Sequence, residues 1–559
     1  MGTTLRRALV RRLDAGSVNG AVVWSVWAAA CGLFLLHVAW YASKLPSEDD
    51  LWLVPYVTGA EPVTATWLWD AFSQHRMPLP KLLLVGLTAP TQSFLPAKLF
   101  NWLLLAASSG GVLLLTRRLR GRSDPCDAAV PIALLSLSQA ELWWTAHALN
   151  LALGATLIVG VLLAVARSPR VETPRAFAAL AGLILALPLC GMVGVAFAPA
   201  LVPWLLATAV SHWRGGTRPG RRFARAFVGL ATATVALCGA YAVGLHLPPQ
   251  QPEPLAERAP RLAGQFARLV SLSTGLTSPD RWRLAAAAVA VPTLAALGLC
   301  LATAGRARPE RLRTLGLLCW LAGWAVLLFG VAWGRSGWWE LFLSRYVTLA
   351  VPVNAWVAVV VALRGRGAWR LIPLALTAAQ VFCLPRSLDV GTTFGVTHAQ
   401  LLKRFEYDIK GSVPVSVLAE QYANALFFGK RDELAARLRE LRAAGWDPFG
   451  GLPADEPFEE ETVALTAGDQ VRLGPATRVA AVRFTYETFG VGPPGELAVT
   501  TDGTPTPRTA ALSGRAGGHT ALVWCDAECR VIAWAFADGG RNHRVTAVTL
   551  LRRGGGKSD

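Results

Sequence analysis

Residues 45–84 read LPSEDDLWLVPYVTGAEPVTATWLWDAFSQHRMPLPKLLL and directly follow the first long hydrophobic stretch of the chain. Three adjacent carboxylates, Glu48, Asp49 and Asp50, stand at the start, although only 16% of the chain is charged. Carboxylates beside a membrane surface are costly to desolvate, so they either face water or take part in chemistry. We interpret residues 45–84 as the active-site loop of a membrane-embedded enzyme. The alternative is a solvated cluster that affects only topology.

Aromatic and basic residues follow the acids in the same loop. Trp52 and Trp69 are of the type that settles at a membrane–water interface or stacks on sugars. His75 and Arg76 come next. A histidine in such a loop is more often solvated than a metal ligand, and no second ligand follows at metal-site spacing. We therefore expect no metal and no cofactor.

The composition indicates a membrane protein. The chain has 559 residues, is 53% hydrophobic, and has a mean hydropathy of +0.40, which is too apolar for a soluble globular protein. Apolar runs of roughly 17–22 residues recur along the first two-thirds, the length that crosses a hydrocarbon core of ~30 Å. No small-residue cleavage site follows the first run, so we expect it to be a retained anchor.

The net charge of +18 comes from short linkers between the apolar runs. Residues 1–20, 117–125, 167–175, 212–225, 305–313 and 364–370 together hold 23 lysines and arginines and four acids. This distribution follows the positive-inside rule, so nucleic acid is not needed to explain the charge. It predicts a cytoplasmic N-terminus.

Hydropathy predicts eleven spans. The first covers about 21–41, and the other ten cover about 97–116, 126–142, 147–166, 176–190, 192–211, 226–246, 284–304, 314–333, 346–363 and 370–386. Alternating them from an inside N-terminus puts every basic linker in the cytoplasm. The closely spaced pair 176–190 and 192–211 is the weakest part of this count. An odd number of crossings leaves the C-terminal segment outside.

The expected fold is thus a polytopic all-α membrane bundle of about eleven transmembrane helices with a C-terminal extracytoplasmic α+β domain. We divide it into a membrane domain, a helical segment, a small β-sandwich and a disordered tail, at 1–386 (first outside loop 42–96), 387–458, 459–552 and 553–559. Leu434, Leu438 and Leu441 recur at helical spacing before Gly445, a plausible terminator. Short alternating runs such as VRFTY, residues 482–486, predict the strands.

Two further charged residues lie on the expected outside. Glu141 is either a helix-end residue at the interface or a second carboxylate facing the first cluster. Arg345, with its neighbour Tyr346, lies where an outside loop enters a span. An arginine there departs from the inside bias, and its planar fork suits a phosphate; the alternative is an interface anchor. Trp338 and Trp339 precede it.

Of nine cysteines, only Cys525 and Cys529 lie in the expected outside domain, in VWCDAECRV. A short turn between adjacent strands would bring them within the ~4.4–6.8 Å between Cα atoms that a disulfide requires. We predict that they are bonded in an oxidising compartment.

The SEDD motif after the first span, the long first outside loop, about eleven spans and the C-terminal outside domain resemble the GT-C superfamily of integral-membrane glycosyltransferases. That superfamily includes the protein O-mannosyltransferases and the aminoarabinose lipid A transferases. The runs LWDAFSQHRMPLPKLL and LRELRAAGWDPF are similar to uncharacterised bacterial members.

The resemblance implies transfer of a sugar, with inversion, from a polyprenyl-phosphate donor to an extracytoplasmic glycan, lipid or protein at a bacterial inner membrane. Asp49 or Asp50 would be the base, and Glu141 would match a second acidic position. The family's pair is often Asp-Glu, so the order Glu-Asp-Asp leaves the base open. Arg345, Tyr346, His75 and Arg76 form the expected donor-phosphate group, and Trp52, Trp69, Trp338 and Trp339 the expected sugar-stacking group. A polysaccharide polymerase, ligase or flippase is the alternative.

Overall fold

The structure is a computed structural model. It describes residues 2–72, 75–168, 170–245, 254–275, 281–302, 304, 308–335, 344–365, 367–453, 458–463, 470–489, 496–502, 504–511, 517–536 and 543–553. The chain divides into two compact units. The helical unit comprises Met1–Lys44 and Val63–Ala399, and the mixed unit comprises Leu45–Pro62 and Gln400–Asp559. The acidic stretch is therefore shared: its first part folds with the C-terminal residues and its second part with the helices.

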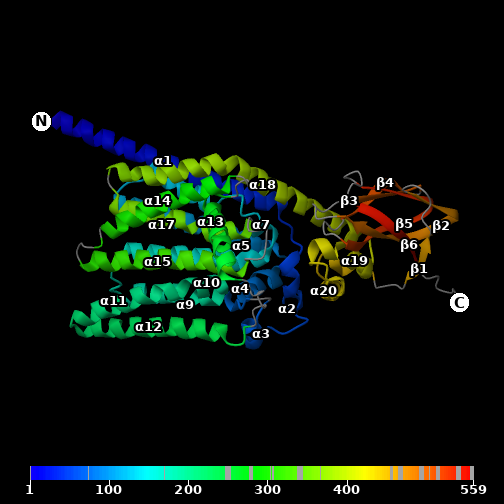
Figure 1. The fold of residues 1–559 in the computed structure, drawn as a ribbon, viewed down its shortest axis with the longest axis horizontal. Helices are drawn as coiled ribbons and strands as arrows, with labels where there is room; N and C mark the ends of the chain where they lie inside the picture. Colours follow the sequence, from blue (N-terminus) through cyan, green and yellow to red (C-terminus); the bar gives the residue numbers. More distant parts are fainter. Residues whose placement is uncertain are drawn as a thin grey trace. The chain divides into compact units, whose positions relative to one another are not determined.

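The helical unit is a bundle of long helices that run side by side (Figure 1). Its helices are α1 (Gly2–Tyr41), α3 (Ala65–Trp69), α4 (Pro78–Thr88), α5 (Leu95–Arg120), α6 (Ala129–Leu134), α7 (Glu141–Trp144), α8 (Leu149–Arg167), α9 (Pro174–Ala186), α10 (Met192–Phe197), α11 (Val202–Arg214), α12 (Arg218–Ala242), α13 (Leu255–Ser271), α14 (Trp282–Ala302), α15 (Arg308–Gly334), α16 (Ser344–Ala350), α17 (Pro352–Arg364) and α18 (Leu371–Lys410). Helix α18 is continuous through residue 387, where we expected the outside domain to begin.

Nine helices in the described part of the chain are long and apolar enough to cross a membrane. They correspond to nine of the eleven expected spans. The other two, 126–142 and 176–190, are represented by shorter apolar helices, Pro125–Leu134 and Pro174–Cys190. Large apolar side chains such as Leu36, Val235 and Leu294 are exposed on the candidate spans, as lipid contact requires. The described part of the chain thus supports nine spans of about eleven expected, and the two short helices leave the count of eleven unconfirmed.

The basic linkers lie together at one end of the bundle. Arg120 pairs with Asp127 at 2.6 Å, and Glu310 pairs with both Arg313 and Arg364. The Arg120–Asp127 pair joins the end of α5 to the short helix η3 (Pro125–Ala128), and the Glu310–Arg364 pair joins α15 to α17. Arg120 Nη2 also donates to the Ala358 carbonyl oxygen of α17 at 3.4 Å. The α11–α12 connection, the C-terminal end of α14 and the N-terminal end of α15 lie at this end, and α4 and α7 lie at the opposite end (Figure 1). The grouping of basic linkers that hydropathy predicted is present in the fold.

The mixed unit contains short helices and one sheet. Its helices are η1 (Glu48–Leu53), α2 (Val54–Thr58), α19 (Val415–Leu426), α20 (Arg431–Ala443) and η9 (Phe449–Gly451). Leu434, Leu438 and Leu441 are fully buried on α20, which confirms the helical pattern. Gly445 follows in a left-handed conformation (φ 69°), and its N–H donates to Arg442 O. The expected terminator therefore ends the helix.

The sheet has six antiparallel strands in the order β1-β6-β2-β5-β3-β4. The strands are β1 (Phe458–Val463), β2 (Gln470–Thr488), β3 (Glu496–Thr501), β4 (Thr504–Ala511), β5 (Gly517–Phe536) and β6 (His543–Arg553). Val482, Phe484 and Tyr486 are buried on β2, as their alternation predicts. The described strands are hydrogen-bonded into a single sheet, and the expected β-sandwich stays a prediction. Register shifts along β2 and β5 bend these long strands, because a bulge adds an unpaired residue to one of them.

Candidate active site

A break in the bundle separates α6 from α7. The segment between them is non-helical, and the buried side chain of Gln139 donates to the carbonyl oxygens of Leu134 (3.0 Å) and Ser136 (3.4 Å). The Ser136 and Ser138 hydroxyls are 2.7 Å apart. Irregular backbone is tolerated inside an apolar bundle only where side chains or a cavity satisfy its polar groups. Hydropathy read this region as one span because most of its residues are apolar.

Glu141 begins α7 and is only 6% exposed. Its Oε2 atom lies 2.9 Å from Arg345 Nε, and the Ser344 hydroxyl donates to its Oε1 atom at 3.2 Å. The backbone N–H of Glu141 donates in turn to the Ser344 hydroxyl at 3.3 Å. The structure therefore brings Glu141 and Arg345 together from opposite halves of the bundle sequence. We name Glu141, Ser344 and Arg345 the carboxylate–arginine cluster.

The two charged side chains of the cluster differ in their exposure to solvent. The Arg345 side chain is 33% exposed, whereas that of Glu141 is 8% exposed. The Arg345 guanidinium and the Ser344 hydroxyl compensate for the burial of the Glu141 carboxylate. The carboxylate thus fixes one edge of the guanidinium from the buried side, while part of the arginine remains accessible.

A second helix break supports Arg345. Helices α16 and α17 meet at Val351–Pro352, where the proline cannot donate a helical hydrogen bond. Past the proline, the N–H of Asn354 donates to the Val351 carbonyl oxygen at 3.1 Å. The Ala350 carbonyl oxygen accepts from the Ser273 hydroxyl (3.0 Å) and from Trp324 Nε1 (3.2 Å). Because this backbone is satisfied, the short helix carrying Arg345 is held in place on its buried side.

The acidic stretch belongs to the mixed unit. Asp50 is fully buried, and its Oδ2 atom accepts from the Ser47 N–H at 3.4 Å as the third residue of a capping box. Glu48 has a left-handed backbone (φ 50°), which is uncommon for a residue with a side chain and is concentrated at functional sites. Asp49 is half-buried. Of the three acids, Asp50 has a structural role, and Asp49 is the stronger candidate for chemistry.

The aromatic and basic residues of this stretch are also engaged. Trp52 packs edge-on against Phe427, with 5.0 Å between the two ring centres. Lys430 Nζ lies 4.1 Å from the ring centre of Trp52. In the helical unit, Arg76 Nη1 donates to the Tyr241 carbonyl at the C-terminal end of α12, and the Arg76 guanidinium lies 5.8 Å from the Trp69 ring. A cation at a helix C-terminus satisfies its last carbonyls. These contacts give Arg76 and Trp52 a packing role.

The remaining expected residues divide into three groups. The backbone of His75 forms an isolated antiparallel β-bridge with that of Phe72. Tyr346, the next residue after Arg345, is buried. Trp338 and Trp339 lie outside the described residues. No group of three or more potential metal ligands occurs among the residues that the structure describes.

The predicted disulfide between Cys525 and Cys529 is not present. Both thiols are free and buried, and both residues lie on the continuous strand β5. Asp526, with φ 41°, marks a bulge there and not a turn between two strands. The geometric argument for the bond was therefore wrong.

Sequence reasoning missed Ser344 and Gln139. The signal for Ser344 is its place directly before Arg345, and that for Gln139 is the polar run SLSQ inside an apolar window. No family model and no curated protein matches the chain.

Proposed function

We propose that the chain is an integral-membrane glycosyltransferase. It moves a sugar, with inversion, from a polyprenyl-phosphate-linked donor to an extracytoplasmic glycan, lipid or protein. The observation that supports this most is Arg345, a partly exposed cation anchored by a buried carboxylate at a break in an apolar bundle. Within membrane-spanning helices such ionisable pairs are rare and mark functional sites.

Arg345 binds the donor phosphate in this proposal. A guanidinium presents several N–H donors in one plane, which match phosphate oxygens two at a time. Contact with Glu141 uses the Nε edge and so orients the rest of the group. A lipid phosphate is a stable leaving group, so its departure needs a cation and no proton donor. Glu141 and Ser344 are positioning residues for Arg345.

Asp49 is the base of the proposed reaction. It takes the proton from the acceptor hydroxyl as that oxygen attacks the anomeric carbon of the donor sugar and the bond to the phosphate breaks. Asp50 holds the capping box, and the left-handed backbone of Glu48 sets the direction of the residue that follows it.

The proposed location is a bacterial inner membrane. The basic ends of α5, α15 and α17 face the cytoplasm according to the positive-inside rule, together with the N-terminus. The carboxylate–arginine cluster then lies on the extracytoplasmic side, where lipid-linked sugars are used.

The helix breaks favour a second candidate, an envelope transporter of the flippase type. Transporters form their substrate sites from discontinuous helices, and α6–α7 and α16–α17 are discontinuous here. The two candidates differ in product, because only the transferase breaks the bond between sugar and carrier.

Mass spectrometry of envelope glycans, lipids and glycoproteins from cells with and without the gene tests the proposal. We expect one glycoform to disappear without the gene and to return with the parent chain. Arg345→Ala should fail to restore it, whereas Arg386→Ala should restore it, because Arg386 is exposed on α18 and pairs only with the exposed Asp389 in the described chain. Unchanged glycoforms would contradict the transferase.

A further inference from the structure

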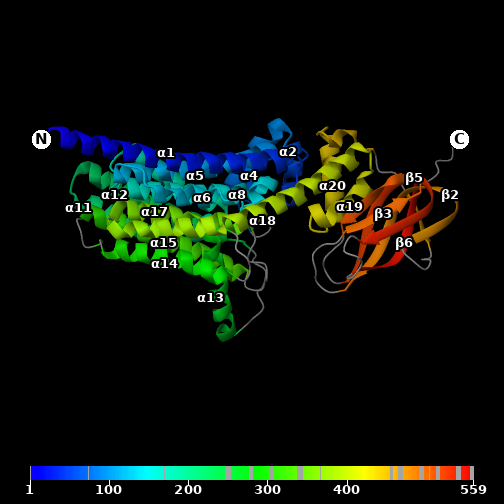
Figure 2. The same cartoon turned by 90° about the horizontal axis from the view of Figure 1, so that it is seen from above.

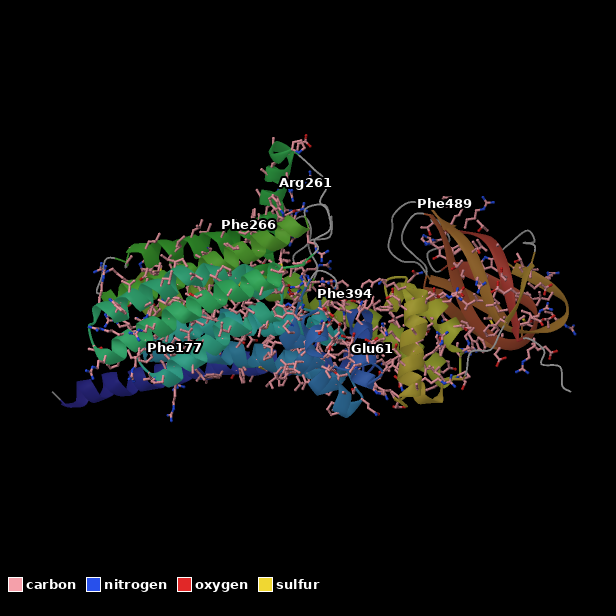
Figure 3. The ribbon with its side chains drawn as sticks, turned by 90° about the horizontal axis from the view of Figure 1, so that it is seen from below. Glu61, Phe177, Arg261, Phe266, Phe394 and Phe489 are labelled. Atoms are coloured by element: carbon pink, nitrogen blue, oxygen red, sulfur yellow. The ribbon has the colours of Figure 1, made fainter. Side chains whose placement is uncertain are left out.

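Helix α13 projects sideways from the bundle, whereas its neighbours run along it (Figure 2). One face of α13, formed by Leu262, Gln265 and Leu269, is buried against the bundle, and the helix packs against α14, α15 and α16. Phe266 lies nearer the bundle and Arg261 nearer the free end of the helix (Figure 3). An amphipathic helix that leaves a bundle crosswise is suited to a membrane–water boundary.

Arginines of α13 stack on tryptophans of the neighbouring helices. The Arg258 guanidinium lies 3.8 Å from the Trp333 ring centre at the end of α15. The Arg268 guanidinium lies 5.3 Å from the Trp282 ring centre at the start of α14. A ring contact uses the flat face of a guanidinium, whereas phosphate oxygens bind along its edge. One arginine can therefore serve both partners.

The stacked arginines lie where the apolar faces of two spans end. On α14, Leu284, Val291 and Leu294 are exposed and recur on one side, and Arg281 and Arg283 precede them. On α15, exposed Phe329 and Trp333 are followed by Arg335. Tryptophan and arginine at the edge of an apolar face mark the depth of the lipid headgroups. The α13 arginines are thus held at headgroup depth.

The net charge of α13 is positive, opposite to that of an anionic phospholipid. Helix α13 carries Arg258, Arg261 and Arg268 against Glu257. These arginines are not in the basic linkers that the positive-inside rule explains. Topology therefore leaves their charge unexplained.

We propose that α13, the first turn of α14 and the end of α15 form an anionic-lipid collar: Arg258, Arg261 and Arg268 hold the phosphates of phospholipid headgroups, and Trp282 and Trp333 lie against the upper acyl chains. The collar is independent of sugar transfer, because its only ligand is the surrounding membrane. Each arginine contributes about fivefold in preference for anionic lipid, corresponding to ~1 kcal/mol per arginine near a charged surface.

Native mass spectrometry of the full-length protein, exchanged into nanodiscs of equal phosphatidylglycerol and phosphatidylcholine, tests the collar. We expect the parent to retain phosphatidylglycerol preferentially. The triple variant Arg258→Gln, Arg261→Gln, Arg268→Gln should lose this preference by at least tenfold. The matched control Arg437→Gln, Arg439→Gln, Arg442→Gln removes the same charge from α20 in the mixed unit and should keep it.

Any of the following results would overturn the collar. They are equal retention of the two lipids by the parent, unchanged preference in the α13 variant, and an equal loss in the α20 control. Displacement of the bound lipid by millimolar inorganic phosphate would also overturn it, because it would identify a site for free phosphate. Circular dichroism of both variants shows whether folding is intact. If the triple glutamine variant does not fold, the three single Arg→Gln changes supply the test: each should lower the preference about fivefold, and an unchanged preference in all three contradicts the collar.

Discussion

Replacing Glu141 by glutamine tests whether the buried carboxylate positions Arg345. Glutamine keeps the shape and an oxygen that can accept from the Ser344 hydroxyl, but it removes the charge 2.9 Å from Arg345 Nε. A hydrogen bond to a charged group contributes about 1.5–3 kcal/mol. Because a third of the Arg345 side chain is exposed, the lower end of that range applies. A loss of ~1.4 kcal/mol corresponds to about tenfold in affinity.

We therefore expect Glu141→Gln to raise the apparent KM for the lipid-linked sugar about tenfold while kcat changes little. Stability should change by less than about 1 kcal/mol, because glutamine can keep the Ser344 hydrogen bond and the exposed part of Arg345 stays hydrated. The assay is sugar transfer by purified protein in nanodiscs, with thermal unfolding measured on the same samples. An unchanged KM in a folded variant would refute the positioning role. A loss of kcat alone would instead assign Glu141 to the chemical step.

Three further predictions follow from the described contacts. Asp49→Asn should reduce sugar transfer by ~10²–10⁴-fold without loss of stability. Asp50→Ala should instead lower the unfolding free energy by roughly 1 kcal/mol or more, because it removes the buried capping-box carboxylate. Transfer assays and thermal melting of both variants measure the two effects. Cys525 and Cys529 should resist maleimide in the folded protein, where burial raises the Cys525 pKa to about 12, and should both be labelled after denaturation without reductant. Burial lowers the pKa of Lys81 from 10.5 to about 8. Between these two pH values the unfolded chain binds more protons than the folded one, so the free energy of unfolding should rise with pH across that window. Lys81→Met should abolish this rise in unfolding curves measured as a function of pH.

The helices were predictable because length and periodicity are local properties. Leu434, Leu438 and Leu441 occupy the buried face of α20 as their spacing requires. Hydropathy could not detect the break before Glu141, because it averages over a window in which Ser136 and Gln139 are a minority. The polar side chains that break the helix also satisfy the exposed backbone, and only their three-dimensional contacts reveal this.

The sheet was misread where local turn signals and strand pairing disagreed. Gly474–Pro475 and the segment CDAEC at residues 525–529 look like turns. In the structure both lie inside long strands, β2 and β5, which pair with each other on either side of the irregular positions. Pairing over many residues outweighs a local preference of about 1 kcal/mol, so the chain continues through a bulge. This also explains why the two cysteines are unbonded neighbours on one strand.

The two interpretations of Arg345 differ in what its guanidinium should contact. An interface anchor extends toward water and leaves its charge hydrated. Arg345 instead places Nε against a carboxylate that is 6% exposed and is itself held by Ser344. Burying Glu141 carries a desolvation penalty that an anchor does not require, since an arginine at the membrane edge is stable in water without a partner. A buried carboxylate that fixes one edge of a partly exposed guanidinium is instead what orientation of a bound anion requires, which favours the phosphate-binding interpretation over the anchor.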